Sequence, residues 1–481
     1  MKILFCASEC FPFFKSGGLG DVAYSLPRAL VKKGLDVRVI SPKYQDMPEE
    51  YKQKLELIDE FSVPVGWRNQ YVGLLHTELD GVHFYFIDNE YYFKRGGAYG
   101  YYDDGERFAY LSRAMTEAAK HIPDFVPEIM HCNDWQTALI PMFLRHFYSS
   151  DPLLWNTKTV LTIHNLKFQG VFSPDVLTEL LGVDMGYNSE DKMKYYDGVS
   201  YMKAGIVFSD RVTTVSKTYA SEIQTEFFGE GLDGLLRKYS YKLSGIVNGI
   251  DYSVFSPSKD KEIFKKYSVK SIAGKAVNKQ ELQKMLGLEE NIQRPLIGII
   301  SRLEKQKGLD LVARIFDELM GATDVQFVVL GTGNRGYEDM LKYFGAKYKG
   351  RVSANIMFSN DLSKKIYSGC DMLLMPSLFE PCGLSQLIAL RYGTIPIVRE
   401  TGGLKDTVIP YNEFEMTGNG FSFANFNAHE MLGVIRYALD IYSRPEHWKK
   451  IVKNAMNSDY SFDKSADEYI SLYNGLCERK D

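Results

Sequence analysis

Three basic side chains lie in one short loop in the second half of the chain. The segment SRLEKQKGLD places Arg302, Lys305 and Lys307 between an apolar strand and a helix expected to begin near Leu309. Cations at this point lie next to the positive end of the helix dipole, and together they can bind an anion such as a diphosphate. We assign this role to Arg302 and Lys307 and expect Lys305 to be a solvated loop charge.

Polar side chains that could hold a sugar follow several other predicted strands. Glu380 follows the apolar segment DMLLMP, His164 follows TVLTI, and His131, Asp134 and Trp135 lie in or just after PEIMHCND. In parallel α/β sheets ligands bind outside the carboxyl ends of the strands, so these residues could form one polyol-binding rim. Each could instead be structural, and on pattern alone Glu380 could equally cap a helix or a turn.

Two glycine loops of nearly the same sequence occur near opposite ends of the chain. KSGGLGDV spans residues 15–22 and TGGLKDTV spans residues 401–408. A helix that starts on glycine can offer bare N–H groups to a phosphate, so both loops are candidate anion sites. The first also fits the loose dinucleotide fingerprint G-x-G-x-x-A. A nicotinamide site would need an acidic residue at the end of the second strand, which ends in Ser41-Pro42, so an oxidoreductase is disfavoured.

The elements that must position these residues are strands and helices that alternate along the chain, joined by loops. The first forty residues predict a βαβ unit, with a strand at 2–8, a helix over 21–34 and a strand at 36–42. Pro27 predicts a kink in this helix or a late start. Further strands are expected at 82–88, 127–134, 159–165 and 211–217.

The alternation of predicted strands and helices stops near residue 250, in a polar stretch that contains Asn-Gly and a proline. It resumes at about residue 295. This predicts an α/β protein with two doubly wound Rossmann-like domains, 1–250 and 251–460, which face a central cleft. An amphipathic helix over 461–481 could pack back on the first domain.

The composition and net charge of the chain disfavour some classes of binding partner. The 481 residues include 57 Lys and Arg against 61 Asp and Glu, a net charge of −4, which disfavours a nucleic-acid binder and a polybasic membrane anchor. No apolar run approaches the roughly 18 residues that span a bilayer, and the start of the chain resembles a strand rather than a signal peptide. The 14% of aromatic residues could fill cores or line a sugar groove.

Metal and redox chemistry are not indicated. The six cysteines are scattered without a C-x-x-C pair, the eight histidines are dispersed, and there is no D-x-D motif. We expect reduced, buried thiols in a cytoplasmic protein, no metal site and no cofactor. The pattern indicates no particular oligomeric state.

Taken together, KSGGLGDV, SRLEKQKGLD, FEPCGLSQL and TGGLKDTV resemble the motifs of bacterial glycogen synthases and plant starch synthases in order and spacing. The resemblance runs from residue 2 to about 460. It implies the two-domain glycosyltransferase-B fold. It also implies transfer of glucose from ADP-glucose to the non-reducing end of an α-1,4-glucan such as glycogen, with retention of configuration and release of ADP.

The resemblance also implies roles for individual residues. Arg302 and Lys307 would stabilise the departing diphosphate, Glu380 would contact the glucose hydroxyls, and His164 would position that sugar. The residues implied on the donor side are Lys15, Gly17, Gly18, Asn248, Phe358, Cys382, Gly383, Leu384, Thr401, Gly402 and Gly403. Those implied on the acceptor side are Asp21, Tyr99, Asp134 and Trp135.

The chain departs from the family pattern at some positions. Phe358 stands where the family usually has a tyrosine against the adenine, and Asn133 stands where many members have a second histidine. The E-x7-E pattern of related glycosyltransferases would need Glu at 388, where this chain has Ile388. That absence agrees with the synthases and disfavours a sucrose-synthase-like enzyme.

The expected mechanism is attack by the acceptor hydroxyl on the same face that the diphosphate leaves, because only Glu380 stands out as a carboxylate. A covalent intermediate stays an alternative at this point. Two other functions also stay open, a glucan synthase that uses UDP-glucose and a non-catalytic glucan-binding protein.

Overall fold

The computed structural model describes residues 1–478, which form two compact units. Unit 1 contains Met1–Asn248 together with the chain from Phe462 onward, and unit 2 contains Gly249–Ser461. The chain therefore passes between the units twice. Each unit encloses its own buried apolar residues, so each has the core of a separate α/β domain.

Unit 1 is built on a nine-stranded sheet. In pairing order its strands are β12 (Leu243–Gly245), β11 (Arg211–Thr214), β7 (Lys158–Ile163), β6 (Ile129–Asn133), β1 (Lys2–Cys6), β2 (Asp36–Pro42), β5 (Val82–Asp88), β4 (Arg68–Leu79) and β3 (Glu56–Val65). The strands from β12 to β5 are parallel, whereas β5, β4 and β3 form an antiparallel meander. The central strands are apolar and buried because helices cover both faces of a parallel sheet.

Short elements complete unit 1. A small antiparallel sheet contains β8 (Val171–Phe172), β10 (Gly198–Ser200) and β9 (Lys194–Tyr195). The helices are α1 (Gly18–Lys32), α2 (Glu49–Lys52), α3 (Glu90–Phe93), α4 (Asp104–Ala118), α5 (Ile140–Phe147), α6 (Tyr201–Phe208), α7 (Lys217–Glu222), α8 (Asp233–Lys238) and α17 (Phe462–Cys477), with single turns at η1 (Leu177–Leu181), η2 (Met185–Tyr187) and η3 (Ser240–Lys242).

The first helix of unit 1 differs from its prediction. α1 begins at Gly18, earlier than residue 21, and continues through the buried Pro27 instead of starting late. Gly34, with φ +91°, follows its end in the left-handed conformation that commonly terminates helices. The early start follows from Gly17, whose extended backbone places it at the N-cap.

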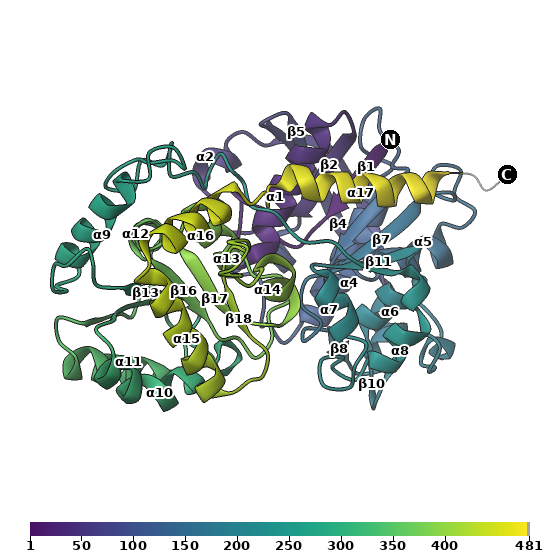
Figure 1. Cartoon of the computed structure of the whole chain (residues 1–481). Coiled ribbons are helices and arrows are strands. Elements are labelled where there is room, and N and C mark those ends of the chain that lie inside the picture. Colours follow the sequence, from purple (N-terminus) through teal and green to yellow (C-terminus); the bar gives the residue numbers. More distant parts are fainter. Residues whose placement is uncertain (479–481) are drawn as a thin grey trace. The chain divides into compact units, whose positions relative to one another are not determined.

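The last helix of the chain belongs to the core of unit 1. α17 lies beside α1, at the other end of the sequence (Figure 1). It buries Phe462, Ala466, Tyr469 and Tyr473 in the same apolar cluster as residues of β1 and α1. The Tyr473 hydroxyl also lies 2.6 Å from Nδ1 of the fully buried His131 on β6.

Unit 2 has an all-parallel six-stranded sheet. Its strands pair in the order β15 (Val352–Asn355), β14 (Gln326–Leu330), β13 (Leu296–Ile300), β16 (Met372–Met375), β17 (Ile395–Arg399) and β18 (Phe421–Phe423). Its helices are α9 (Gly274–Met285), α10 (Leu309–Ala322), α11 (Arg335–Lys347), α12 (Asn360–Gly369), α13 (Ser385–Arg391), α14 (Gly402–Thr407), α15 (Ala428–Tyr442) and α16 (Pro445–Asn457), with the single turn η4 (Lys305–Lys307).

Both sheets have the doubly wound order. Along the chain, the strands of unit 2 pair as 3-2-1-4-5-6, and the parallel strands of unit 1 follow the same rule. α10 and α11 lie on one side of the unit 2 sheet, and α12 and α13 lie on the other (Figure 1). The order reverses between β13 and β16 in unit 2, and between β1 and β6 in unit 1. Ligands of such sheets bind outside the carboxyl ends of the strands at these switch points.

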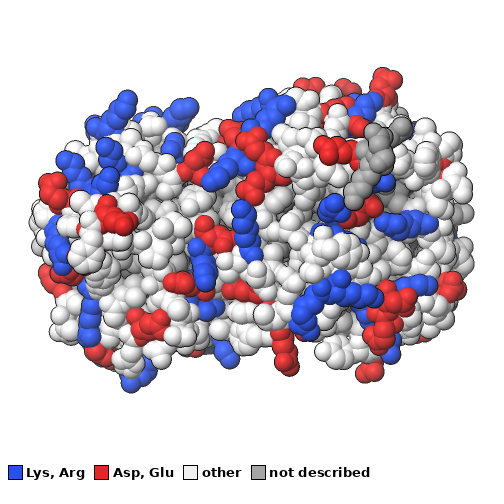
Figure 2. Space-filling model, turned by 45° about the vertical axis from the view of Figure 1, so that its right-hand side comes forward, with Lys and Arg blue, Asp and Glu red and all other residues white. Residues whose placement is uncertain are grey.

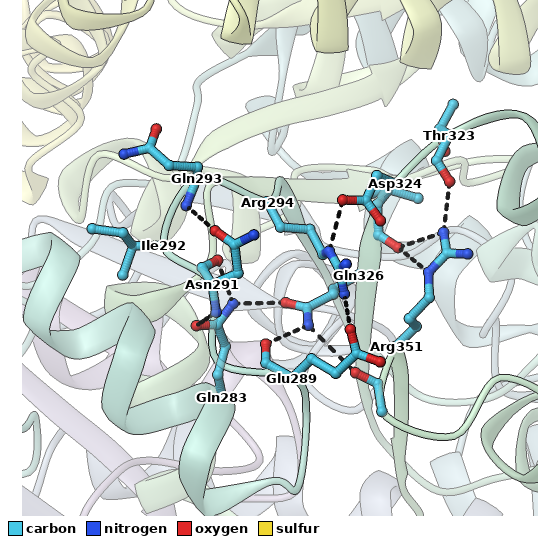
Figure 3. A network of polar contacts seen from close by, with 12 residues as sticks. Gln283, Glu289, Asn291, Ile292, Gln293, Arg294, Thr323, Asp324, Gln326 and Arg351 are labelled. Atoms are coloured by element: carbon cyan, nitrogen blue, oxygen red, sulfur yellow. Dashed lines mark hydrogen bonds and ion pairs between the residues drawn. The ribbon is translucent and has the colours of Figure 1, made fainter.

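A polar network joins the opposite, amino ends of the unit 2 strands to the chain after α9 (Figure 3). The buried Gln283 donates from Nε2 to Oε1 of the buried Gln326 at 2.7 Å, and Gln326 donates to the Glu289 carbonyl at 2.8 Å. Arg294 bridges Glu289 at 2.5 Å and Asp324 at 2.9 Å. The network therefore holds α9 and its following loop to the edge of the sheet.

Replacing Gln326 by alanine is expected to lower the free energy of unfolding by about 1–2 kcal/mol, because it removes the hydrogen bonds that Gln326 makes with the buried Gln283 amide and with the Glu289 carbonyl and leaves Gln283 Nε2 with only the Asn291 carbonyl as acceptor. Urea unfolding of the full chain measures this loss. Gln293→Ala, an exposed glutamine of the same loop, is the matched control and should unfold like the wild type. Equal stability of the two variants would show that the network contributes nothing.

Candidate active site

The carboxyl ends of β13 and β16 border a cavity of about 200 Å³ in unit 2. Ser301, Arg302 and Lys307 line it from the loop after β13, and Ser377 and Glu380 line it from the loop after β16. This is the switch point of the sheet. Two of the predicted donor residues, Gly383 and Leu384, also line the cavity.

The centre of this cavity is an ion pair. Lys307 Nζ lies 2.6 Å from Glu380 Oε2, and the Ser377 hydroxyl donates to the same oxygen at 3.0 Å. The side chains of Lys307 and Glu380 are only 16% and 11% exposed. A pair so withdrawn from water is held in one geometry, with the Lys307 ammonium and the Glu380 carboxylate both at the wall of the cavity.

The other basic residues of the loop are exposed. Arg302 pairs with Glu304 at 3.1 Å, and its side chain is 62% exposed. Such a surface pair is worth little, so it opposes rotation of Arg302 toward an anion only weakly. Lys305 is exposed as well, in the same single turn as Lys307.

Ser301 is a cavity residue that the sequence motifs did not single out. Its hydroxyl is buried and has no hydrogen-bond partner among the described residues. An unpaired buried hydroxyl is costly unless a ligand supplies the partner. Its place directly after β13 is the signal that could have found it.

The second glycine loop packs against the segment that carries Glu380. Gly402 has φ +44°, and a Cβ there would lie 2.0 Å from the Glu380 carbonyl oxygen; a Cβ on Gly403 would lie 2.0 Å from the Cys382 carbonyl oxygen. The Gly403 N–H donates to the Glu380 carbonyl at 3.1 Å. The glycines thus allow close backbone packing, and the N–H of Gly403 is used within the protein instead of lying bare. Thr401, before them, is buried.

The two glycine loops occupy different places in their sheets. The first follows β1, at the switch point of unit 1, whereas the second follows β17, which is not a switch-point strand. The element of unit 2 that corresponds to the first loop is the basic loop after β13. The similarity of the two glycine sequences therefore does not reflect equivalent positions.

The remaining donor-side residues lie apart from the cavity lining. Phe358, just before α12, is 84% exposed and does not line the cavity. Cys382, two residues after Glu380 in the loop that follows β16, is buried. Asn248, the last residue of the first segment of unit 1, is buried, and its Oδ1 has no partner among the described residues.

In unit 1 the first glycine loop is held by a carboxylate that the sequence analysis missed. Glu9, buried just after β1, accepts hydrogen bonds from the N–H groups of Ser16 and Gly17. Burial raises the pKa of Glu9. Lys15, which is exposed, pairs with Asp21 at 2.7 Å. The N–H of Gly17 is therefore already engaged, whereas Lys15 faces outward with its partner on α1.

Asp134 and His164 meet at the ends of β6 and β7. Asp134 Oδ1 accepts the His164 N–H at 2.7 Å, and Asp134 has a left-handed backbone with φ +55°. Burial raises the pKa of Asp134 to about 7 and lowers that of His164 to about 4. A strained backbone together with a buried carboxyl is typical of a functional position.

Asn133 fixes the orientation of the His164 ring. Its Nδ2 donates to the Cys6 carbonyl at 3.0 Å, so its Oδ1 faces His164 Nε2 at 2.9 Å and accepts that proton. Neutral His164 is therefore protonated on Nε2, and Nδ1 is left as the acceptor. The asparagine that departs from the family pattern thus acts on His164.

Of the other residues of unit 1 that were predicted as site residues, two lie near the end of β1 or the start of α1 and two are buried in the core. The Tyr99 hydroxyl lies 2.8 Å from Ser8 Oγ, after β1, and Gly18 is the exposed first residue of α1. Trp135 is only 8% exposed and packs in the core against aromatic neighbours. His131, bonded on both ring nitrogens to Tyr473 and to Thr162, is a buried structural group.

Replacing Asp134 by asparagine is expected to stabilise the protein at pH 8. Between about pH 4 and 7 the folded state keeps a proton on Asp134 that the unfolded state releases, so wild-type stability falls as the pH rises through this range. Urea unfolding should therefore find Asp134→Asn more stable at pH 8, by about 1–2 kcal/mol, and less so at pH 5. Asp197→Asn, an exposed control, should show no such difference. A variant less stable at pH 8 than at pH 5, relative to wild type, would contradict the raised pKa.

The surface carries no strong charge bias in the view of Figure 2, where Lys and Arg are interspersed with Asp and Glu. Among residues 1–478, no group of three or more His, Cys, Asp or Glu is arranged to hold a metal ion. Within the same residues, no helix is both long and apolar enough to cross a membrane.

Comparison with known proteins agrees with this arrangement. Residues 2–238 match the family model described as starch synthase catalytic domain, and residues 280–455 match that of glycosyl transferases group 1. The chain is 56% identical over 479 residues to a glycogen synthase of Clostridium novyi (strain NT), with 100% of both chains covered. It is 55% identical over 479 residues to a glycogen synthase of Caldicellulosiruptor saccharolyticus, covering 99% of this chain and 100% of the other.

Among solved structures, the chain resembles the catalytic domain of starch synthase IV from Arabidopsis thaliana bound to ADP and acarbose. The TM-score is 0.91 at 34% identity, with 99% of each chain covered. A sucrose-phosphate synthase from Thermosynechococcus elongatus shares the fold at a TM-score of 0.61 and 15% identity, covering 99% of this chain and 98% of that one. The chain therefore belongs to the family of bacterial glycogen synthases and plant starch synthases, which are glycosyltransferases of the glycosyltransferase-B fold.

Proposed function

We propose that this protein is a glycogen synthase that transfers glucose from ADP-glucose to the non-reducing end of an α-1,4-glucan, with retention of configuration and release of ADP. The observation that carries the proposal is the Lys307–Glu380 pair at the wall of the unit 2 cavity. It places a cation for a diphosphate next to a carboxylate for sugar hydroxyls, as a nucleotide sugar requires.

The donor is assigned to unit 2. Lys307 and Arg302 together supply two positive charges for the two phosphates, and charge-assisted hydrogen bonds of this kind are strong. Glu380 accepts hydrogen bonds from the glucosyl hydroxyls, and the unpaired Ser301 hydroxyl is a further donor at the same wall. Phe358 is proposed for the base, because its exposed ring can stack on adenine.

The acceptor is assigned to unit 1. The Asp134 carboxyl presents an acceptor for glucan hydroxyls at the end of β6, and Tyr99 adds a hydroxyl. His164, at the end of β7, keeps the role that the resemblance implies, and its Nδ1 is the acceptor proposed for a hydroxyl of the transferred glucose. Lys15 and Asp21 form the rim of this site at the start of α1. The pKa of Asp134 is raised because burial keeps this carboxyl away from water and so disfavours its charged form.

The chemistry we propose is attack from the front face. The bond between the anomeric carbon and the phosphate oxygen breaks, the acceptor O4 forms its bond on the same face, and its proton passes to the departing phosphate. Lys307 and Arg302 stabilise the charge that develops on ADP. A covalent intermediate would need a carboxylate nucleophile, and Glu380, the single acid among the described residues that line the cavity, is already held by Lys307 and Ser377.

The donor is taken as ADP-glucose because the starch synthase that this chain resembles was solved with ADP bound. The test is to incubate the protein with glycogen and either ADP-glucose or UDP-glucose, and to measure the nucleoside diphosphate released and the chains elongated. ADP release with elongation is the expected result. Faster turnover with UDP-glucose would change the donor, and glycogen binding without release from either donor would make the protein a glucan-binding protein.

A further inference from the structure

The Lys307–Glu380 pair joins two loops that follow different strands of unit 2. Lys307 ends the single turn η4 after β13, and Glu380 lies in the loop after β16. The 2.6 Å contact between them depends on a fixed register of the two loops, because a shift of about 1 Å is enough to misplace a reacting group. The residues that set this register therefore decide where the cation lies relative to the carboxylate.

Gln306, directly before Lys307, holds the two loops together in two ways. Its carbonyl accepts the Leu378 N–H at 2.8 Å, and its side-chain Nε2 donates to the Phe379 carbonyl at 3.0 Å. Leu378 and Phe379 are the two residues before Glu380. The residue next to the cation is thus bonded, through its backbone and its side chain, to the residues next to the carboxylate.

The two loops meet again on the other side of Lys307. Gly308 has φ +69°, and a Cβ there would lie 2.0 Å from the Pro376 carbonyl oxygen, so only glycine allows this approach. Lys307 is therefore flanked by contacts with the loop that carries Glu380. The contact at Gln306 includes a side chain, so a substitution can remove that part of it without changing the backbone.

The loop after β16 is also held from the side of β17. Arg399 on β17 is 8% exposed, and it donates from Nε to the Ser377 carbonyl at 2.8 Å and from Nη2 to the Leu378 carbonyl. A buried guanidinium that donates to two consecutive carbonyls fixes this loop against the sheet. Because η4 is only a single turn, removal of the Gln306 amide should displace Lys307 and leave the loop after β16 in place.

We propose that Gln306 is a positioning residue of the donor site, whose amide holds Lys307 at the distance from Glu380 that the transfer reaction needs. The inference rests on the proposed function, which supplies the reaction. Gln306 is not among the described residues that line the cavity, so it acts through Lys307 and does not touch the donor. A displaced cation still attracts a diphosphate, since Coulomb attraction falls slowly with distance, whereas stabilisation of the departing charge requires a preorganised position. The amide therefore affects turnover more than donor affinity.

The test is the rate of ADP release from ADP-glucose and glycogen by the full-length protein that carries Gln306→Met. Methionine has about the length of glutamine but donates no hydrogen bond. We expect kcat to fall about tenfold, because Lys307 loses its fixed position, and KM for ADP-glucose to stay within about twofold. Gln280→Met, the same exchange at an exposed position of α9, is the matched control and should turn over like the wild type.

A second measurement separates positioning from a general loss of stability. If Gln306 acts only through Lys307, the double variant Gln306→Met/Lys307→Ala should be no slower than Lys307→Ala alone. A merely structural role of Gln306 would lower kcat independently of Lys307, so the two losses would multiply. Losses that multiply overturn the positioning role.

Unchanged kcat in Gln306→Met, or an equal loss in Gln280→Met, also overturns it. Circular dichroism checks folding; should Gln306→Met unfold, Gln306→Asn is measured instead, because its shorter side chain cannot reach the Phe379 carbonyl. Gln306→Asn should then lose kcat to a similar extent, and unaltered turnover overturns the positioning role. Nucleotide release by the wild type separates the two proposals. Release together with unaltered turnover of the variants refutes only the positioning role, whereas no release from either donor refutes the proposed function.

Discussion

Lys307→Ala is expected to lower kcat by about two to three orders of magnitude while the protein stays folded. The Lys307 ammonium lies at the wall of the unit 2 cavity, and its loss removes a preorganised charge from the departing diphosphate, which typically costs this much. The measurement is ADP release at saturating ADP-glucose and glycogen, with circular dichroism to check the fold.

Lys305→Ala is the matched control for this prediction. Both lysines lie in η4, but Lys305 is exposed and is not part of the cavity lining. Its removal changes the net charge by the same amount and should leave kcat within about twofold of the wild type. Similar losses in both variants would mean that the charge of the loop matters and its geometry does not. Near-normal turnover of Lys307→Ala would remove Lys307 from the catalytic residues.

Glu380→Ala is expected to cause a loss of similar size, about two orders of magnitude or more in kcat. The substitution removes the acceptor proposed for the glucosyl hydroxyls, and it leaves the withdrawn Lys307 ammonium without its partner at 2.6 Å. Glu380→Gln keeps a hydrogen-bonding group of the same shape but removes the charge. Comparison of the two variants therefore separates contact with the sugar from pairing with Lys307.

The double variant Lys307→Ala/Glu380→Ala tests whether the two residues act as a unit. Because they share one ion pair, the combined loss in kcat/KM should be much smaller than the product of the single losses. Losses that multiply would show that each residue acts alone. Turnover by Glu380→Ala close to the wild type, with the fold intact, would contradict its assigned role.

Much of the sheet could be predicted because its strands are short apolar runs that end in polar residues. β1, β2, β5, β6, β7 and β11 lie where the sequence placed strands, and α10 begins at Leu309 as expected. The hairpin of β3 and β4 was not predicted. β3 is an edge strand with exposed Glu56, Asp59 and Glu60, so it lacks the apolar run on which the other predictions depended.

The site was predictable where a residue's role depends on its own loop, and less so where the role depends on distant partners. Arg302 and Lys307 follow one strand, so their convergence could be read locally. Glu9 and Ser301 were missed as site residues, and Asn133 was noted only as a departure from the family pattern, because their roles arise from contacts made or left open in the fold. The pattern of the second glycine loop allows two interpretations, since close packing and anion binding both favour glycine; the structure shows the close packing, and anion binding stays a prediction.

The placement of α17 in unit 1 has a consequence for the order in which the protein forms during translation. Unit 2 is continuous in sequence, so a ribosome delivers all of it before α17 emerges, and it can fold while synthesis continues. Unit 1 cannot complete its apolar cluster, or pair the buried His131 with Tyr473, until the last helix is released. The half assigned to the donor can therefore fold first, and the half assigned to the acceptor is completed only after α17 has been synthesised.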